Sequence, residues 1–173
     1  PRVAAALERA RRPSVIWLPF QECTGCTESI TRAHGSTLES LIFQGISLDY
    51  QHTLQAAAGD AADRARETAM QENWGRYLLI VDGSIPTGNK GFSTIAGRDN
   101  LSLLQEAARG AAAIVALGSC AAFGGIPGAD PNPTGAVPVS AIVKDKPIIN
   151  VSGCPPIPVV ITGVLTQYLT FGK

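Results

Sequence analysis

Residues 14–20 read SVIWLPF, and residues 22–28, which follow almost at once, read ECTGCTE. A short apolar run rich in β-branched and aromatic residues is typical of a buried strand. The two cysteines of ECTGCTE therefore lie in the loop that leaves the first predicted strand. The rest of the chain is interpreted outward from this strand and its loop.

Further apolar runs predict strands at residues 77–81, 112–117 and 147–151. Helices are predicted at residues 56–73, 100–109 and 139–143, and a last helix ends near residue 171. Strands that alternate with helices indicate a parallel sheet with right-handed crossovers. We therefore predict one three-layer α/β domain over residues 1–173, with an open parallel sheet of flavodoxin-like or Rossmann-like type.

Two further sequence patterns predict structure in segments outside the strands of the sheet. Residues 36–39, STLE, predict a capping box that starts a helical segment before residues 46–50. Residues 1–12, PRVAAALERARR, predict a short terminal helix or a solvated arm that Pro13 ends.

The composition of the chain limits its partners. Fourteen basic and 14 acidic residues cancel, so no overall field attracts nucleic acid, and we expect no nucleic-acid partner. Only 16% of residues are charged and 45% are hydrophobic, whereas about 25% are charged in an average soluble domain. We infer that another subunit covers part of the surface.

The four cysteines of the chain each follow a predicted strand. Cys23 and Cys26 come after the first, Cys120 after residues 112–117, and Cys154 after residues 147–151. In an open parallel sheet the loops at the carboxyl ends of the strands share one edge, where ligands bind. The sequence therefore predicts that these distant cysteines converge on one site.

Four such thiols are compatible with three kinds of chemistry: an iron–sulfur cluster, a zinc ion or disulfides. Structural zinc usually takes two short CxxC-like pairs, and the second pair is missing here. Widely spaced ligands suit a larger body, so the spacing favours a cluster and leaves zinc and disulfides as alternatives. Nearby glycines such as Gly25, Gly118 and Gly125 would let backbone N–H groups approach bound sulfur.

Two rival motifs are weak. Residues 83–90, GSIPTGNK, resemble a phosphate-binding loop, but Asn89 separates glycine from lysine and no Ser or Thr follows Lys90. Residues 24–27 lie where flavodoxin-like proteins bind flavin phosphate, and two cysteines there argue against flavin.

Five motifs, in order along the chain, resemble the small subunit of nickel–iron hydrogenases of the uptake, membrane-associated type. They are ECTGCTES at 22–29, DGSIPTG at 82–88, GSCAAFGG at 118–125, NPTGAVP at 132–138 and GCPPIP at 153–158. The resemblance implies a flavodoxin-like fold and one proximal [4Fe–4S] cluster. The implied iron ligands are Cys23, Cys26, Cys120 and Cys154.

The resemblance also implies partners. The nickel–iron centre that oxidises hydrogen or reduces protons belongs to a large subunit, and this chain passes electrons onward to an acceptor such as a membrane cytochrome b. It implies a place at the periplasmic face of the bacterial cytoplasmic membrane, although no leader peptide is present in this sequence. Family members carry further iron–sulfur clusters in a C-terminal region that is absent here, which we interpret as truncation.

Glu22 stands where the family carries a glutamate associated with proton transfer, so the resemblance makes Glu22 a candidate proton relay. The alternative is a carboxylate bonded to local backbone. Two other functions stay open: the cluster-bearing subunit of a quinone reductase, and a zinc-stabilised interaction module. The first carries adjacent cysteines in this motif, whereas Thr24 and Gly25 separate the pair here.

Overall fold

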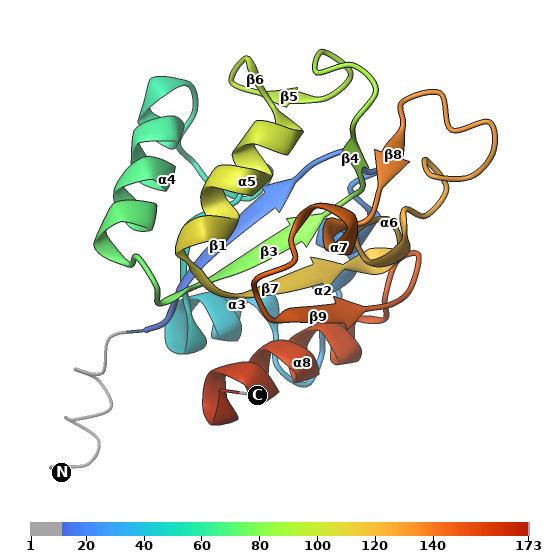
Figure 1. Cartoon of the computed structure of the whole chain (residues 1–173). Coiled ribbons are helices and arrows are strands. Elements are labelled where there is room, and N and C mark those ends of the chain that lie inside the picture. Colours follow the sequence, from blue (N-terminus) through green and yellow to red (C-terminus); the bar gives the residue numbers. More distant parts are fainter. Residues whose placement is uncertain (1–11, 173) are drawn as a thin grey trace, which may run out of the picture.

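The computed structural model describes residues 12–172 and contains one central parallel sheet (Figure 1). The arm or helix predicted for residues 1–12 lies outside the described residues, apart from Arg12. Five strands form the sheet in the order β2 (Ser47–Tyr50), β1 (Ser14–Pro19), β3 (Tyr77–Asp82), β7 (Ala111–Leu117) and β9 (Ile148–Val151). This is the flavodoxin-like 2-1-3-4-5 order, so the predicted fold class is confirmed.

Helices cover both faces of the sheet, as Figure 1 shows. One face carries α4 (Asp60–Glu72), α5 (Asn100–Gly110), α6 (Gly118–Phe123) and α7 (Val139–Ile142), and the other carries α2 (Gly25–Ile30), α3 (Leu38–Ser40), the π-helix η1 (Leu41–Gly45) and α8 (Pro158–Phe171). Alternate residues of each strand point to opposite faces. Ile16 and Leu18 therefore pack under α4 and α5, whereas Val15 and Trp17 pack toward α2 and α8.

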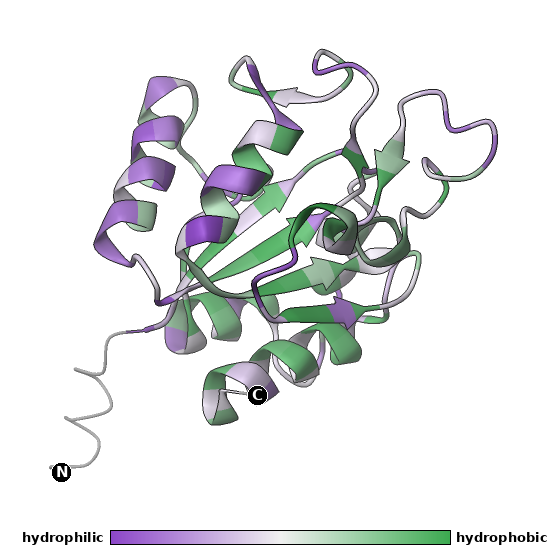
Figure 2. Ribbon diagram, viewed as in Figure 1, coloured by the Kyte–Doolittle hydropathy of each residue, from purple (hydrophilic) through white to green (hydrophobic). Residues whose placement is uncertain are grey.

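The sheet is hydrophobic because it is buried on both sides. Every residue of β1 and β3 is buried, as expected for central parallel strands. Figure 2 shows these strands as hydrophobic and α4 as largely hydrophilic. Short two-residue strands lie outside this sheet: β4 (Ile85–Pro86) pairs with β8 (Ala136–Val137), and β5 (Thr94–Ile95) with β6 (Arg98–Asp99).

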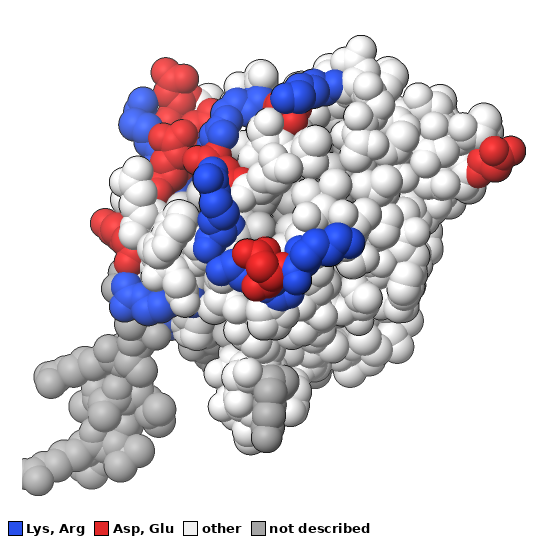
Figure 3. Space-filling model, viewed as in Figure 1, with Lys and Arg blue, Asp and Glu red and all other residues white. Residues whose placement is uncertain are grey.

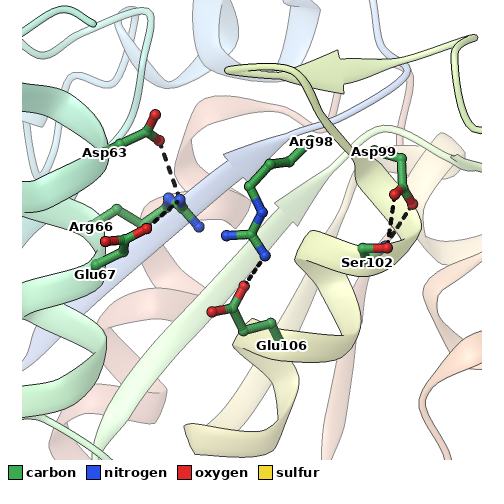
Figure 4. A network of polar contacts seen from close by, with 7 residues as sticks. All are labelled: Asp63, Arg66, Glu67, Arg98, Asp99, Ser102 and Glu106. Atoms are coloured by element: carbon green, nitrogen blue, oxygen red, sulfur yellow. Dashed lines mark hydrogen bonds and ion pairs between the residues drawn. The ribbon is translucent and has the colours of Figure 1, made fainter. Parts of the chain in front are cut away.

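Polar contacts link charged side chains of α4, β6 and α5 on the outer layer (Figure 4). Arg66 is almost fully buried and pairs with Asp63 at 3.2 Å, and its guanidinium lies 5.9 Å from the centre of the Tyr50 ring. Arg98 pairs with Glu106 on α5. The contact between Arg66 and Tyr50 joins α4 to β2.

Most predicted boundaries differ from the observed ones by a few residues, and three of these differences change a helix start or the site. The capping box at 36–39 is wrong by one residue: Thr37 is the N-cap and accepts from the Ser40 amide at 3.1 Å. Helix α4 begins at Asp60 rather than at residue 56, because Gly59 adopts a φ of +56° that no right-handed helix contains. Strand β3 continues through Asp82, which brings a buried carboxyl to the strand end. Within residues 12–172, no helix is long and apolar enough to cross a membrane.

Candidate functional site

The four cysteines lie at the carboxyl edge of the sheet. Cys23 and Cys26 flank the start of α2, Cys120 lies in α6 directly after β7, and Cys154 follows β9. One small pocket collects all four, and it is lined by Glu22, Cys23, Gly25, Cys26, Asp82, Ser119, Cys120, Gly153, Cys154 and Pro155. The convergence predicted from the sequence is therefore present, because each cysteine follows a parallel strand.

All four thiols are free, so no disulfide forms between them. Cys23 and Cys154 are exposed, whereas Cys26 and Cys120 are half-buried. The pocket thus opens to the surface along one rim. A group bound here would be partly exposed on the side of Cys23 and Cys154.

Glycines leave room for the sulfur atoms. A Cβ on Gly118 would lie 2.6 Å from Cys26 Sγ, and a Cβ on Gly125 would lie 2.6 Å from Cys120 Sγ. Real Cβ atoms do not approach sulfur so closely, since non-bonded heavy atoms are best separated by about 3.5–4.0 Å. The Cys26 and Cys120 thiols therefore occupy space that the side chain of any residue other than glycine at 118 or 125 would fill.

Burial makes the Cys26 and Cys120 thiols hard to ionise in the absence of a bound cation. It raises the pKa of Cys26, and the neighbouring Asp82 carboxyl raises it further. Burial also raises the pKa of Cys120, with Cys154 adding to the effect. Neither lysine, arginine nor histidine occurs among the lining residues. A positively charged metal group would supply the compensating charge and let the thiols bind as thiolates.

Asp82, which lies just beyond the strand predicted at residues 77–81, also lines the pocket. Its carboxyl is buried, one of its oxygens, Oδ2, has no hydrogen-bond partner, and burial together with the Glu22 charge raises its pKa to about 7. The signal was present: Asp82 directly follows the apolar run at residues 77–81, at the edge where ligands bind.

Glu22 lines the same pocket. Its Oε1 accepts a hydrogen bond of 3.3 Å from the Thr24 hydroxyl, and Oε2 is buried without a partner. Burial raises its pKa, and the bond from Thr24 opposes that shift. Two carboxyls with unpartnered oxygens therefore face the thiol pocket.

The arrangement does not suit a single metal ion. In the part of the chain that the structure describes, no three His, Cys, Asp or Glu side chains are grouped to hold one. All thiolates of a zinc site bind the same ion, each with a Zn–S distance of about 2.3 Å. Four thiols around a glycine-lined pocket, with no counter-charge of their own, fit an iron–sulfur cluster, whose iron atoms take thiolate ligands at separate corners.

A larger groove lies away from this edge, along α4 and the starts of β1 and β2. Its charged lining residues are Arg12, Asp49, Arg64 and Glu72, and it contains neither cysteine nor histidine. We therefore assign the chemistry to the cysteine pocket rather than to the larger groove.

The fold and this edge define a class: an α/β protein of flavodoxin topology with a four-thiol pocket where that topology binds its ligands. The chain belongs to the family described as NADH ubiquinone oxidoreductase, 20 Kd subunit, whose model matches residues 23–168.

Hydrogenase small subunits are among the similar proteins. The chain is 45% identical to the uptake hydrogenase small subunit of Azotobacter vinelandii over 174 residues, covering 100% of this chain and 49% of that protein. It is 42% identical to the hydrogenase-2 small chain of Escherichia coli K12, covering 99% of this chain and 46% of that protein. The chain thus spans about half the length of these relatives. The resemblance to hydrogenase small subunits is confirmed.

A solved structure agrees with the fold. The Ni-Fe-Se hydrogenase of Desulfomicrobium baculatum matches with a TM-score of 0.87 at 31% identity, covering 92% of this chain and 62% of the matched chain. Within the family, these similarities favour the hydrogenase interpretation over the quinone reductase one.

Proposed function

We propose that this chain is the electron-transfer part of a nickel–iron hydrogenase, in the small subunit. It passes electrons between the nickel–iron site of a large subunit and a downstream acceptor. The observation that carries this proposal is the convergence of four free thiols on one pocket of a chain that is 42–45% identical to hydrogenase small subunits.

In this proposal Cys23, Cys26, Cys120 and Cys154 hold one [4Fe–4S] cluster, which supplies a one-electron carrier when bound. The chain's own residues exclude water from one side of the pocket and hold the thiols in place. Burial of Cys26 and Cys120 limits access of water to one side, and the glycines at 118 and 125 keep that side free of side chains. The rigid parallel sheet holds the thiols at set positions, so little rearrangement accompanies a change of charge.

The large subunit would dock over the pocket. Phe123, Ile126, Ile157 and Val159 are exposed apolar side chains on the segments that follow β7 and β9. In the view of Figure 3, charged side chains gather mainly over α4 and α5, and the part over α6 and β8 is almost free of them. An uncharged, apolar rim beside the pocket is the surface that a permanent partner covers.

Glu22 is proposed as a proton relay between this pocket and the large subunit. Its place on the pocket wall beside Cys23 supports the role. Glu22→Gln keeps the shape and removes the ability to carry a proton, so hydrogen turnover by the two-subunit enzyme should fall. Unchanged turnover would eliminate the relay.

Three finer points are part of the proposal. The acceptor is a membrane cytochrome b, further clusters occur in a region beyond the part matched here, and the enzyme acts at the periplasmic face of the cytoplasmic membrane. Fractionation of cells that produce the whole enzyme tests the last point. Activity recovered only with the cytoplasm would contradict it.

The central experiment measures iron, acid-labile sulfide and zinc per chain in protein purified without oxygen. About four iron and four sulfide per chain are expected, as the cubane cluster requires. Cys120→Ser should reduce both, whereas the matched control Ser140→Ala, at an exposed position of α7, should reduce neither. Zinc without sulfide would overturn the proposal.

A further inference from the structure

The turn that carries Cys154 is unusually poor in its own hydrogen-bond donors. Residues 155 and 156 are both proline and lack backbone N–H groups. Gly153 precedes Cys154 with a φ of +140°, and a Cβ there would lie 2.4 Å from Pro156 Cα. The turn therefore depends on groups from other elements to hold Cys154 in place.

Ser119 bonds the first part of this turn twice. Its backbone N–H donates to the Gly153 carbonyl at 2.8 Å, and its hydroxyl oxygen accepts from the Gly153 N–H at 3.3 Å. Ser119 lies next to Cys120 and lines the thiol pocket. The positions of Cys120 and Cys154 are thereby linked through one serine.

Ser29 bonds the far part of the turn. Its buried hydroxyl donates to the Pro156 carbonyl at 2.6 Å. Ser29 belongs to α2, the helix that contains Cys26. Gln51, fully buried after β2, donates to the Thr27 hydroxyl at 3.0 Å and holds the same helix from its other side.

These bonds join the three cysteine-bearing segments at one place. Ser119 bonds the Cys154 turn to α6, and Ser29 bonds it to α2. Neither serine is among the four residues proposed to bind the cluster. We propose that Ser29 and Ser119 are positioning residues that preset the Cys154 turn, so that the four thiols are arranged before iron and sulfide bind. This inference rests on the proposed cluster-binding function.

The test separates the hydroxyl from the shape of the side chain. Ser119→Thr and Ser119→Val have nearly the same volume, but only threonine keeps the oxygen that accepts from Gly153. The whole chain, loaded with iron and sulfide, is mixed with a ferrous chelator without oxygen, and iron release is followed over time. Far-UV circular dichroism checks that each variant is folded.

The valine variant should release iron about tenfold faster than the threonine variant, because an orphaned amide weakens the turn. The threonine variant should match the wild type, and so should Ser140→Ala. Ser29→Ala should also release iron faster, since it leaves the buried Pro156 carbonyl without a donor.

Equal release from the valine and threonine variants would overturn the positioning role while leaving cluster binding intact. A wild-type chain that takes up no iron and sulfide would overturn the proposed function as well. If Ser119→Val does not fold, Ser29→Ala decides: release as slow as in the wild type overturns the inference.

Discussion

Gly118 offers a direct test of how the pocket holds its thiols. It is the first residue of α6, its φ is +82°, and a Cβ there would lie 2.6 Å from Cys26 Sγ. Gly75 is a matched control, because its φ is +77° and a Cβ there meets nothing within 4 Å. Gly118→Ala and Gly75→Ala therefore share the backbone strain and differ in whether they displace a thiol.

The size of each effect follows from these values. A left-handed conformation costs an L-residue about 1–2 kcal/mol, so both variants should lose this much of the free energy of unfolding. In Gly118→Ala the new methyl group must also reach a contact distance of about 3.5–4.0 Å, which moves Cys26 Sγ by about 1 Å. Metal sites tolerate a displacement of only about 0.2 Å in ligand distances, so cluster binding should fail.

Two measurements separate the effects. Urea unfolding of the cluster-free chains should give a loss of stability in both variants, at least as large in Gly118→Ala because its methyl group also displaces Cys26 Sγ. Iron content after reconstitution should fall only in Gly118→Ala. Full iron content in Gly118→Ala would refute the idea that Cys26 is a ligand at this position. An equal loss of iron in Gly75→Ala would show that backbone strain alone disturbs the site.

Three further predictions concern the cluster-free chain. Because the pKa of Asp82 is raised from 3.8 to about 7, the folded state keeps a proton that the unfolded state releases, and the free energy of unfolding should fall as pH rises through that window. Asp82→Asn should weaken this dependence in urea titrations at several pH values, and the raised pKa of Glu22 should leave the remainder. Tyr77 donates from its buried hydroxyl to the Ala107 carbonyl, so Tyr77→Phe should cost about 1–3 kcal/mol in the same assay, and no loss would contradict the bond. Asp99 caps α5 by accepting from the Ser102 amide at 2.9 Å, so Asp99→Ala should lower stability by about 1 kcal/mol at neutral pH. Since its backbone and side-chain bonds with Ser102 lower the pKa of Asp99, the effect of that variant should disappear as pH falls through this lowered pKa.

Much of the architecture could be predicted from local pattern. The apolar runs at residues 77–81 and 112–117 have the length and continuity of strands buried on both faces, and the structure places β3 and β7 there. The short strand β2 was not predicted as a strand, because the polar residues Ser47 and Asp49 interrupt its apolar residues. In the structure the Ser47 hydroxyl donates a hydrogen bond to the Asp49 carboxylate. The observed starts of α4 and α3 also differ from the predicted ones, because Gly59 precedes the first residue of α4 and Thr37 is the N-cap of α3.

The sequence by itself determined that four cysteines follow strands, and hence that they meet at one edge, because parallel strands all end on the same side of a sheet. Only the tertiary structure decided what surrounds them. The Ser29 bond to Pro156 joins residues 127 positions apart, and the close approach of Gly118 to Cys26 joins residues 92 positions apart. The raised pKa of the Asp82 carboxyl depends on burial by neighbouring elements. Such contacts depend on side-chain direction and packing in three dimensions, which no local periodicity records.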